Sequence, residues 1–427
     1  MNRGRCAATK EKVILANTSC SFSSFLPEFQ VTKEVNELPY GGGWHVRLAQ
    51  QIAKSTDRYD LECWSIEKRL EKEFVAHDDD IRYRFFPAQR MGFDRINLGE
   101  VSWPLLRELG NEVKKQNSLV HLHSAFTWTT AFASLLIKKA PILVQCYEDR
   151  SLLQLFLNTP ERKRYSYLAS YLVKGFFFER ALKKRVDCFF VLNKPTERYF
   201  SRLVGAEKVH ISPMGIDFSV YRKIDKNRAR DDLGLDSNKK YVLCVAAMVE
   251  RKGLNYLIRS MPTICGKLPN TELLLVGEGY YKKQLQLLAQ KLRIQDKIHF
   301  IPAEDSEPRV PDEKLPLYYN AADVFVLPSI IEALGVVGIE AMACETPFIG
   351  TNVEGIPSLV EQFEAGLLIQ PRDLNAIASA VINVLEDGAV LSTNRERAKN
   401  YFDWHYVAKR NIDVYDALFN RFYGGSK

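Results

Sequence analysis

The sequence predicts an α/β protein made of two successive doubly wound domains, each with a parallel sheet between layers of helices. Short apolar runs alternate with amphipathic stretches along most of the chain, as buried parallel strands joined by helices require. This alternation ends near residue 213 and starts again near residue 238, which indicates two separate sheets. A length of 427 residues with 46% hydrophobic residues provides enough apolar material for two cores.

The first set of elements spans residues 12–213. Its apolar runs have the length of strands, and the stretches 45–55 and 129–140 have the period of amphipathic helices. We expect strands at 12–19, 61–66, 83–88, 119–124, 141–147, 187–193 and 208–213.

The second set follows a polar, turn-rich segment, 214–237, which we interpret as the linker. Its strands and helices are expected in the runs 238–248, 252–264, 271–277, 281–293, 296–302, 315–323, 324–329, 338–345, 347–352 and 376–387. The aromatic stretch 401–422 either closes the second domain or crosses back to the first. The predicted divisions are therefore 1–215, 216–400 and a C-terminal helix within 401–427.

Composition excludes several classes of protein. Charged residues make up 26% of the chain, an ordinary globular value that argues against disorder, collagen or coiled coil as the overall class. No run reaches about 18 apolar residues, so no membrane-spanning helix is expected. The basic first dozen residues lack the apolar run of a secretory signal. The eight cysteines are scattered without CxxC or zinc-ligand spacing, which favours buried thiols in a reducing, cytoplasmic compartment.

Positive charge is concentrated in the first half of the chain. Residues 1–213 carry 33 Lys and Arg against 24 Asp and Glu, whereas residues 214–427 carry 26 against 28. The basic half is a candidate for an anionic partner, and the alternative is solvated charge without a partner. No nucleic-acid recognition motif is present, so nucleic acid is not an expected partner.

One basic stretch, 161–185, contains eight basic and two acidic residues interleaved with Tyr, Leu, Val and a Phe triplet. This composition is typical of an interfacial helix on an anionic membrane surface. The alternative is a core helix that turns its basic side chains to water. The membrane hypothesis places the protein on the inner, cytoplasmic face of a membrane, peripherally bound near a lipid-linked acceptor.

The segment 328–360 carries the most specific chemical signal. Glu332 follows an apolar strand, and seven residues that include Gly335 and Gly338 separate it from Glu340. A glycine loop at the start of a helix exposes backbone N–H groups at the positive end of the helix dipole, which suits a diphosphate. An acidic side chain about one turn into that helix can accept hydrogen bonds from a ribose diol.

This arrangement resembles the Glu–seven–Glu motif of family-4 retaining glycosyltransferases, which have the GT-B fold. Other segments resemble family motifs in the usual order, so the resemblance spans nearly the whole chain. They are LPYGGGWHVRLAQQIA (38–53), LVHLHS (119–124), SPMGIDFSVY (212–221), AMVERKGLNYLIRSM (247–261), LLLVGEGYYKKQLQ (273–286), FIGTNVEGIPSLV (348–360) and FDWHYVAKR (402–410). The resemblance implies two Rossmann-like domains that face each other across a cleft, with the donor nucleotide sugar on the second and the acceptor on the first.

The resemblance also implies roles for individual residues. Glu332 would contact the donor sugar near the reacting carbon, and Glu340 would hold the ribose. Lys252, with Arg251 beside it, would neutralise the departing diphosphate. Backbone groups close to the phosphates would come from Gly42, Gly43, Gly277, Leu334, Gly335, Val336 and Val337.

The physics of the reaction agrees with a basic side chain beside the leaving group. Retaining transfer passes through an oxocarbenium-like state and expels a nucleoside diphosphate, so a fixed cation there stabilises charge that develops only in the transition state. No Asp-x-Asp motif stands near a strand end. We therefore expect no metal, and no cofactor besides the nucleotide-sugar co-substrate.

Some positions depart from the family pattern. Ala247 replaces the usual Arg five residues before the Lys, and Tyr147 replaces the His that often ends its strand. Met214 and Glu345 replace the usual Asn and Gly. These changes suggest a divergent branch of the family.

The acceptor side is expected to include His123, Tyr147 and Glu148. His121 is expected to be structural, on the argument that His121 and His123 alternate on one strand and that one of them alone can face a cleft.

Structural explanations remain open for the main site residues. Glu332 could cap the helix, Glu340 could be a surface glutamate, and Arg251 and Lys252 could be solvated helix-start residues. The leading hypothesis is a retaining hexosyltransferase that moves a sugar from a nucleotide-diphosphate sugar to a glycan or glycolipid. The alternatives are a nucleotide-sugar epimerase of the same fold and a non-catalytic sugar- or partner-binding module, which the absent Arg and His favour.

Overall fold

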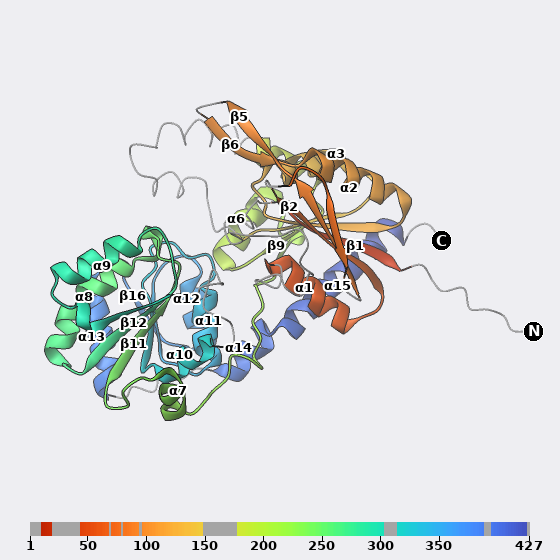
Figure 1. The fold of residues 1–427 in the computed structure, drawn as a ribbon. Helices are drawn as coiled ribbons and strands as arrows, with labels where there is room; N and C mark the ends of the chain where they lie inside the picture. The colour runs from red at the N-terminus through yellow and green to blue at the C-terminus, as the bar shows by residue number, and fades with distance from the viewer. Residues whose placement is uncertain are drawn as a thin grey trace, which may run out of the picture. The chain divides into compact units, whose positions relative to one another are not determined.

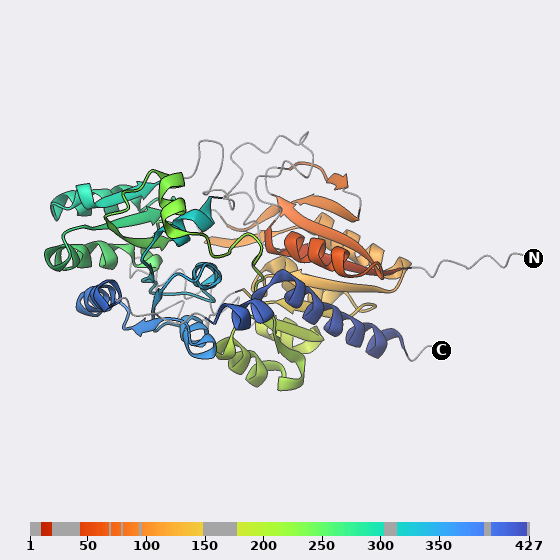
Figure 2. The same ribbon diagram turned by 90° about the horizontal axis from the view of Figure 1, so that it is seen from below.

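The computed structural model describes residues 10–18, 43–67, 70–77, 80–93, 96–147, 177–302, 314–387 and 394–424 (Figure 1; Figure 2). These residues form two compact units. The N-terminal unit runs to Leu192 and also contains Thr196–Ser212 and the chain from Val407 onward. The C-terminal unit comprises Asn193–Pro195 and Pro213–Tyr406.

The N-terminal unit contains a sheet of eight strands in the order β10-β9-β8-β7-β1-β2-β4-β3. All neighbouring strands are parallel except the edge strand β3, which is antiparallel to β4. The bounds are β1 (Glu11–Asn17), β2 (Tyr59–Glu67), β3 (Phe74–His77), β4 (Ile81–Pro87), β7 (Ser118–His123), β8 (Ile142–Gln145), β9 (Cys188–Val191) and β10 (Val209–Ile211). Two further strands, β5 (Gln89–Phe93) and β6 (Ile96–Val101), form an antiparallel pair.

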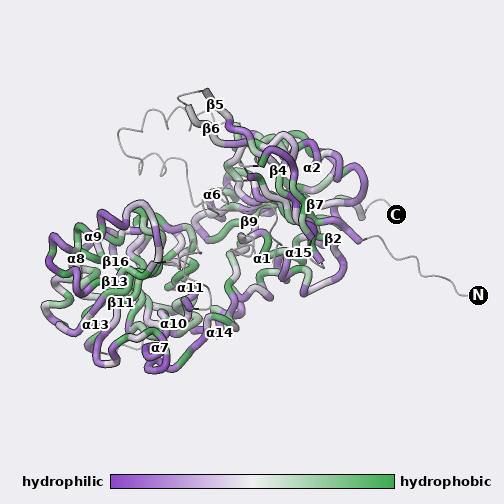
Figure 3. The backbone as a smooth tube through the Cα atoms, in the orientation of Figure 1, coloured by the Kyte–Doolittle hydropathy of each residue, from purple (hydrophilic) through white to green (hydrophobic). Residues whose placement is uncertain are grey.

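Central strands of this sheet are buried on both faces because helices cover both. Val13, Ile14 and Leu15 of β1 have no exposed surface. The helices are α1 (Gly43–Ser55), α2 (Trp103–Lys115), α3 (Trp128–Leu136), the helical residues 177–185, α6 (Lys194–Val204) and most of α15 (Trp404–Tyr423). Figure 3 shows hydrophobic stretches inside each unit and hydrophilic stretches along the outer helices and loops.

The C-terminal unit contains a fully parallel sheet of six strands in the order β13-β12-β11-β14-β15-β16. Its strands are β11 (Lys240–Val245), β12 (Thr271–Val276), β13 (Ile298–Ile301), β14 (Val324–Leu327), β15 (Phe348–Thr351) and β16 (Leu367–Ile369). Its helices are α7 (Lys226–Leu233), α8 (Leu254–Lys267), α9 (Lys282–Lys291), α10 (Leu315–Ala321), α11 (Val336–Ala343), α12 (Ile356–Phe363), α13 (Leu374–Asp387) and α14 (Arg395–Phe402). This alternation of strands and helices is the doubly wound arrangement.

The last helix, α15, begins in the C-terminal unit and continues along the N-terminal unit. The Tyr415 hydroxyl lies 2.7 Å from Nδ1 of His121, and the Tyr423 hydroxyl donates to the Ser118 carbonyl at 2.9 Å. Of the two alternatives for the 401–422 stretch, the chain from Val407 onward therefore packs on the N-terminal unit.

The segment 214–237, interpreted as a linker, is instead part of the C-terminal unit. It contains α7, which Asp225 caps by accepting from the Arg228 amide. Arg230 is 4% exposed, donates to the Ala321 carbonyl and pairs with Asp323 at 2.8 Å. The polar composition of the segment suggested a solvent-exposed linker. The segment is instead held to the rest of the unit by a charged residue, Arg230, which is buried.

The elements that were not predicted are α2, α6, α7, α12, α14, β3, β5, β6 and β16. The helix expected over 129–140 ends earlier, at Leu136. The α2 helix had a recognisable start, since the Ser102 side chain accepts from the Leu105 amide and Pro104 occupies the first turn.

No helix in the described ranges is long and apolar enough to cross a bilayer.

Candidate functional site

The candidate donor site lies in the C-terminal unit, in loops that follow the carboxyl ends of three strands. The loop after β11 leads through residues Glu250–Lys252 to α8, and Gly277 follows β12. The loop after β14 carries Glu332 and leads to α11. Because β12, β11 and β14 are parallel neighbours, these three loops meet at one edge of the sheet.

Lys252 and Glu332 form a direct ion pair at this edge. The Lys252 ammonium lies 2.5 Å from Oε2 of Glu332, and the two side chains are 12% and 11% exposed. The Ser329 hydroxyl donates to the same carboxylate oxygen at 2.9 Å. The Glu332 amide donates to the Glu354 carboxylate at 2.9 Å. Both the backbone and the side chain of Glu332 are therefore fixed.

The start of α11 provides backbone N–H groups beside this pair. Gly335 occupies the N-cap position with a φ of +75°, which a residue with a Cβ adopts only under strain, and no side chain caps the helix. Within the described ranges, no group accepts a hydrogen bond from the amides of Leu334, Gly335, Val336 or Val337. Glu332 is thus not a helix cap, and the positive end of the helix remains open to an anion.

Glu340 lies one turn into α11. The Tyr319 hydroxyl donates to its Oε2 at 2.8 Å. Tyr319 is completely buried, and this burial is the largest cause that raises its pKa well above the usual value. Tyr319 therefore stays a neutral donor and orients the Glu340 carboxylate, which is partly exposed.

Gly277 has a structural reason to be glycine. Its φ is +138°, and a Cβ built there would lie 2.2 Å from the carbonyl oxygen of Ala246. The close approach of the β11 and β12 ends thus requires a residue without a side chain.

Replacement of Gly277 by alanine is expected to lower the free energy of unfolding by about 2–3 kcal/mol, because the strained φ and the backbone clash act together. Denaturant unfolding measures this loss. Gly266→Ala in α8 is the matched control, since nothing lies within 4 Å of the added Cβ. That control should gain about 0.5–1 kcal/mol. Equal effects of the two substitutions would contradict the close-approach argument.

Two other positions near Lys252, Arg251 and Ala247, do not contribute a cation next to Glu332. Arg251 is exposed, and its carbonyl accepts from the Ile330 amide at 2.8 Å. Its guanidinium forms no ion pair with any residue that the structure describes. Ala247, which replaces the family Arg, is exposed as well. Lys252 is therefore the cation that the structure places next to Glu332.

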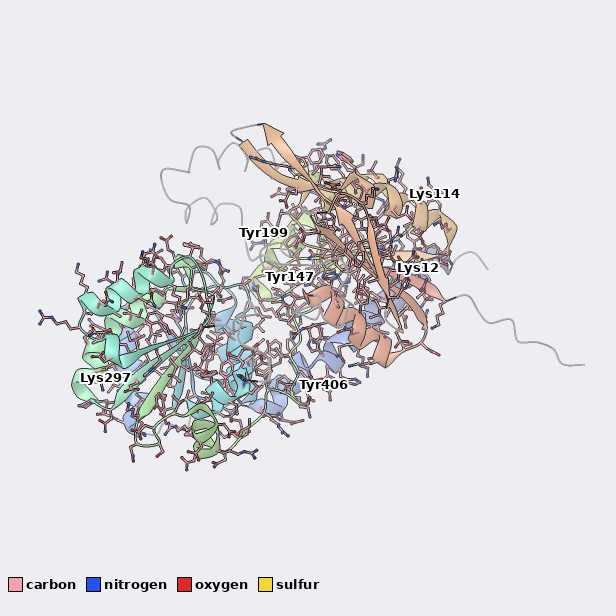
Figure 4. All side chains as sticks on the ribbon, in the orientation of Figure 1. Lys12, Lys114, Tyr147, Tyr199, Lys297 and Tyr406 are labelled. Atoms are coloured by element: carbon pink, nitrogen blue, oxygen red, sulfur yellow. The ribbon has the colours of Figure 1, made fainter. Side chains whose placement is uncertain are left out.

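The N-terminal unit holds the remaining predicted residues. Gly43 is the first residue of α1 and has a φ of +79°. Gly42 and Glu148 lie outside the described residues. His123 ends β7, and Tyr147, labelled in Figure 4, follows β8. The Tyr147 hydroxyl lies 2.5 Å from Nδ1 of His123, and burial raises the pKa of Tyr147.

Three histidines form a buried cluster in this unit. The rings of His121 and His123 stack with centroids 4.2 Å apart, and His45 lies 5.6 Å from His123. The expectation that His121 and His123 face opposite sides of the strand is wrong, because residues two apart on a strand share a face. Nε2 of His45 lies 3.0 Å from the Ser65 hydroxyl, whereas Nε2 of His121 and of His123 have no hydrogen-bond partner among the described residues.

Burial keeps these three imidazoles neutral. It lowers the pKa of His45 and of His121 to about 3, and it lowers that of His123 well below the usual value, with smaller contributions from the neighbouring histidines. No group of three or more His, Cys, Asp or Glu side chains in the described ranges is arranged to hold a metal ion.

The site contains residues that the sequence did not single out. Ser329 and Glu354 hold Glu332, and Tyr319 holds Glu340. Ser329 and Glu354 lie within the segments that resemble family motifs, so the sequence could have indicated that they belong to the site. Tyr319 comes from α10, and nothing in its local sequence indicates that it reaches α11.

Together the two units define a fold of the GT-B class, in which Rossmann-like parallel sheets are paired in one chain. Sucrose-phosphate synthase from Thermosynechococcus elongatus superposes with a TM-score of 0.71 at 22% identity, over 96% of this chain and 100% of that chain. Anabaena HepE in complex with UDP superposes with a TM-score of 0.68 at 17% identity, over 95% of this chain and 100% of that chain. These likenesses establish the fold.

The family follows from sequence. Residues 225–402 match the model of Glycosyl transferases group 1. One relative is the GDP-mannose-dependent alpha-(1-6)-phosphatidylinositol monomannoside mannosyltransferase of Mycolicibacterium smegmatis, which is 30% identical over 207 residues. That match covers 46% of this chain and 52% of the relative. The chain thus spans about half the length of the curated relative it matches. The predicted GT-B fold and glycosyltransferase family are confirmed.

Proposed function

We propose that the chain is a retaining, metal-independent glycosyltransferase that transfers a hexose from a nucleotide-diphosphate sugar to a glycan or lipid-linked acceptor. The observation that carries this proposal is the Lys252–Glu332 ion pair, at 2.5 Å, beside the uncapped start of α11. A cation, a carboxylate and free backbone amides are the groups that a departing diphosphate and a reacting sugar require.

In the proposed complex, each of these groups acts on one part of the donor. The amides of Leu334–Val337 and the Lys252 ammonium bind the diphosphate, and Glu340 accepts from the ribose hydroxyls. Glu332 accepts from hydroxyls of the donor sugar. Gly42, Gly43, Gly277 and Arg251 are proposed to lie close to the donor as well.

The chemical step breaks the bond between the anomeric carbon and the diphosphate oxygen. The electron pair leaves on that oxygen, where Lys252 stabilises the new negative charge. An acceptor hydroxyl oxygen forms the new bond on the same face of the sugar, and its proton passes to the departing diphosphate oxygen. Glu332, held by Ser329, provides a fixed negative charge near the developing oxocarbenium ion.

We propose the division of labour that the family resemblance implies. Residues 216–400 would bind the nucleotide sugar and residues 1–215 the acceptor, with His123, Tyr147 and Glu148 on the acceptor side. The helix within 401–427 would complete the acceptor-binding part. The hydrogen bond between His123 and Tyr147 supports this assignment because it fixes a polar pair at the carboxyl edge of the N-terminal sheet.

The mannosyltransferase relative supports a lipid-linked acceptor, because its name specifies a phosphatidylinositol monomannoside. Contact with an anionic membrane through 161–185, on the cytoplasmic face, belongs to the same proposal. Residues 161–176 lie outside the described residues. In the described remainder Phe178 is buried and Arg180, Lys183 and Lys184 are exposed, as in a core helix with a basic outer face.

The proposal is tested by incubating the full chain with UDP-, GDP- and ADP-hexoses and a mixture of glycan and polyprenyl- or inositol-lipid acceptors. The expected result is acceptor-dependent release of one nucleoside diphosphate, with the donor's anomeric configuration preserved in the product by NMR. Interconversion of donors without transfer would point to an epimerase. Nucleotide binding without either reaction would point to a binding module.

A further inference from the structure

A shallow groove of about 460 Å³ lies on the surface of the N-terminal unit. It is lined by Gln89, Trp103, Pro104, Leu106, Arg107 and Leu136. Trp103 and Arg107 are one turn apart on α2, and Leu136 ends the neighbouring helix α3. Figure 1 shows these two helices on one side of the sheet. None of these residues belongs to the proposed donor or acceptor sites.

Large apolar side chains are exposed at and beside this groove. Trp103 is 47% exposed, Leu136 60% and Leu135 38%. They are three of the seven large apolar side chains that are exposed in the described part of the chain, so the exposed apolar groups gather here. The Trp103 ring packs on Phe132 with centroids 5.1 Å apart, which holds the indole in one place.

Positive charge accompanies the groove in the sequence. Arg107 lines the groove and is exposed. Arg90, Lys138 and Lys139 are also exposed and stand one to three residues from the lining positions Gln89 and Leu136. The two carboxylates of α2 are neutralised by other cations, Glu108 by Arg84 at 3.1 Å and Glu112 by Lys12 at 3.0 Å. Glu100 lies opposite Arg90 across the β5–β6 pair.

Ring contacts connect the groove to the described part of the basic, aromatic stretch 161–185. Phe132 of α3 contacts Trp103 on one side and Phe177 on the other, with the Phe177 ring at 5.9 Å. Phe178 packs against Trp128 at the start of α3, with centroids 5.0 Å apart. The chain therefore brings a basic, aromatic segment and an exposed apolar groove to the same helix.

We propose that the groove between α2 and α3 docks the N-terminal unit on the surface of an anionic lipid bilayer. Trp103, Leu135 and Leu136 enter the boundary between headgroups and acyl chains, where tryptophan is favoured. Arg107 and the neighbouring lysines contact anionic headgroups. The purpose of this docking rests on the proposed function, because docking would bring the enzyme to a lipid-linked acceptor. The test of docking itself does not require sugar transfer.

The test is co-sedimentation of the full chain with vesicles of phosphatidylcholine, with and without phosphatidylglycerol, at low salt. Wild type is expected to bind the anionic vesicles and not the neutral ones. The double variant Trp103→Ser/Leu136→Ser is expected to bind at least about tenfold more weakly, because each substitution removes buried apolar surface. Arg107→Gln should weaken binding severalfold, with a reduced salt dependence.

Leu287→Ser is the matched control, because Leu287 is 55% exposed and lies on α9 of the C-terminal unit. It should bind vesicles like wild type. Nucleotide binding by calorimetry should be the same in all variants, which separates this proposal from failure of the donor site. No wild-type binding, unchanged binding by the double variant, or equal binding to neutral vesicles would overturn the proposal. So would a concentration-dependent dimer in light scattering that the double variant loses, since a second copy would then cover the groove.

Discussion

Replacement of Lys252 by methionine is expected to lower the turnover number of sugar transfer by about 10²–10³-fold. The ammonium is the cation that the structure places at the Glu332 carboxylate, 2.5 Å away, beside the open end of α11. In the transition state the departing diphosphate gains charge, and methionine fills the same space without supplying a compensating cation. Steady-state kinetics with saturating donor measure this loss.

Two comparisons separate catalysis from folding. Lys252→Met leaves the nearly buried Glu332 carboxylate without its cation, so a double variant that adds Glu332→Gln should regain stability but not activity. Lys239→Met is the matched control, because Lys239 pairs with Glu272 at 2.7 Å. That ion pair lies at the amino ends of β11 and β12, away from the carboxyl ends that carry the candidate site. A control variant as inactive as Lys252→Met, or a Lys252→Met enzyme with full turnover, would contradict the assigned role.

A steep loss of stability on mild acidification is expected from the histidine cluster. Burial lowers the pKa of His45 and His121 from 6.5 to about 3, so the unfolded chain binds protons that the folded chain does not. The contribution of these histidines to the free energy of unfolding is therefore fully present above pH 6.5, and it is lost as the pH decreases towards 3. Below pH 6.5 each neutral histidine contributes a slope of about 1.4 kcal/mol per pH unit.

The measurement is denaturant unfolding between pH 6.5 and about 5, a range in which ordinary carboxylates stay ionised. His45→Asn should reduce the slope, whatever it does to stability at neutral pH. His405→Asn, at an exposed position on α15, should leave the slope unchanged. A free energy of unfolding that is constant over this range would show that the three imidazoles are accessible to protons in the folded state.

The parallel sheets were predictable because buried strands leave continuous apolar runs. Stretches such as 271–277 and 324–329 correspond to β12 and β14 almost residue for residue. The α7 helix was not predictable in this way, since its contribution depends on Arg230, whose partners Asp323 and the Ala321 carbonyl are some 90 residues away. Charged composition alone did not distinguish such a residue from a solvated one.

In the candidate site, too, local sequence patterns identified some residues, but contacts between residues far apart in the sequence could not be predicted. Glu332, Glu340 and Lys252 stand out by spacing and by resemblance, and the structure brings Lys252 to Glu332. The partner of Glu340 comes from α10, a contact between neighbouring helices that no local pattern encodes. The histidines were recognised as residues, but their stacking required the period of the strand to be applied correctly.

The central claim is that the C-terminal unit binds a nucleotide sugar through the start of α11 and Glu340. Its most direct test is calorimetric titration of UDP, GDP and ADP into wild type, Glu340→Ala and the matched control Glu361→Ala, an exposed glutamate on α12. We predict that one nucleotide binds wild type and the control equally and binds Glu340→Ala roughly 10–100-fold more weakly, the cost of a lost charged hydrogen bond. Binding of no nucleotide by wild type, or equal affinity in Glu340→Ala, would contradict the claim.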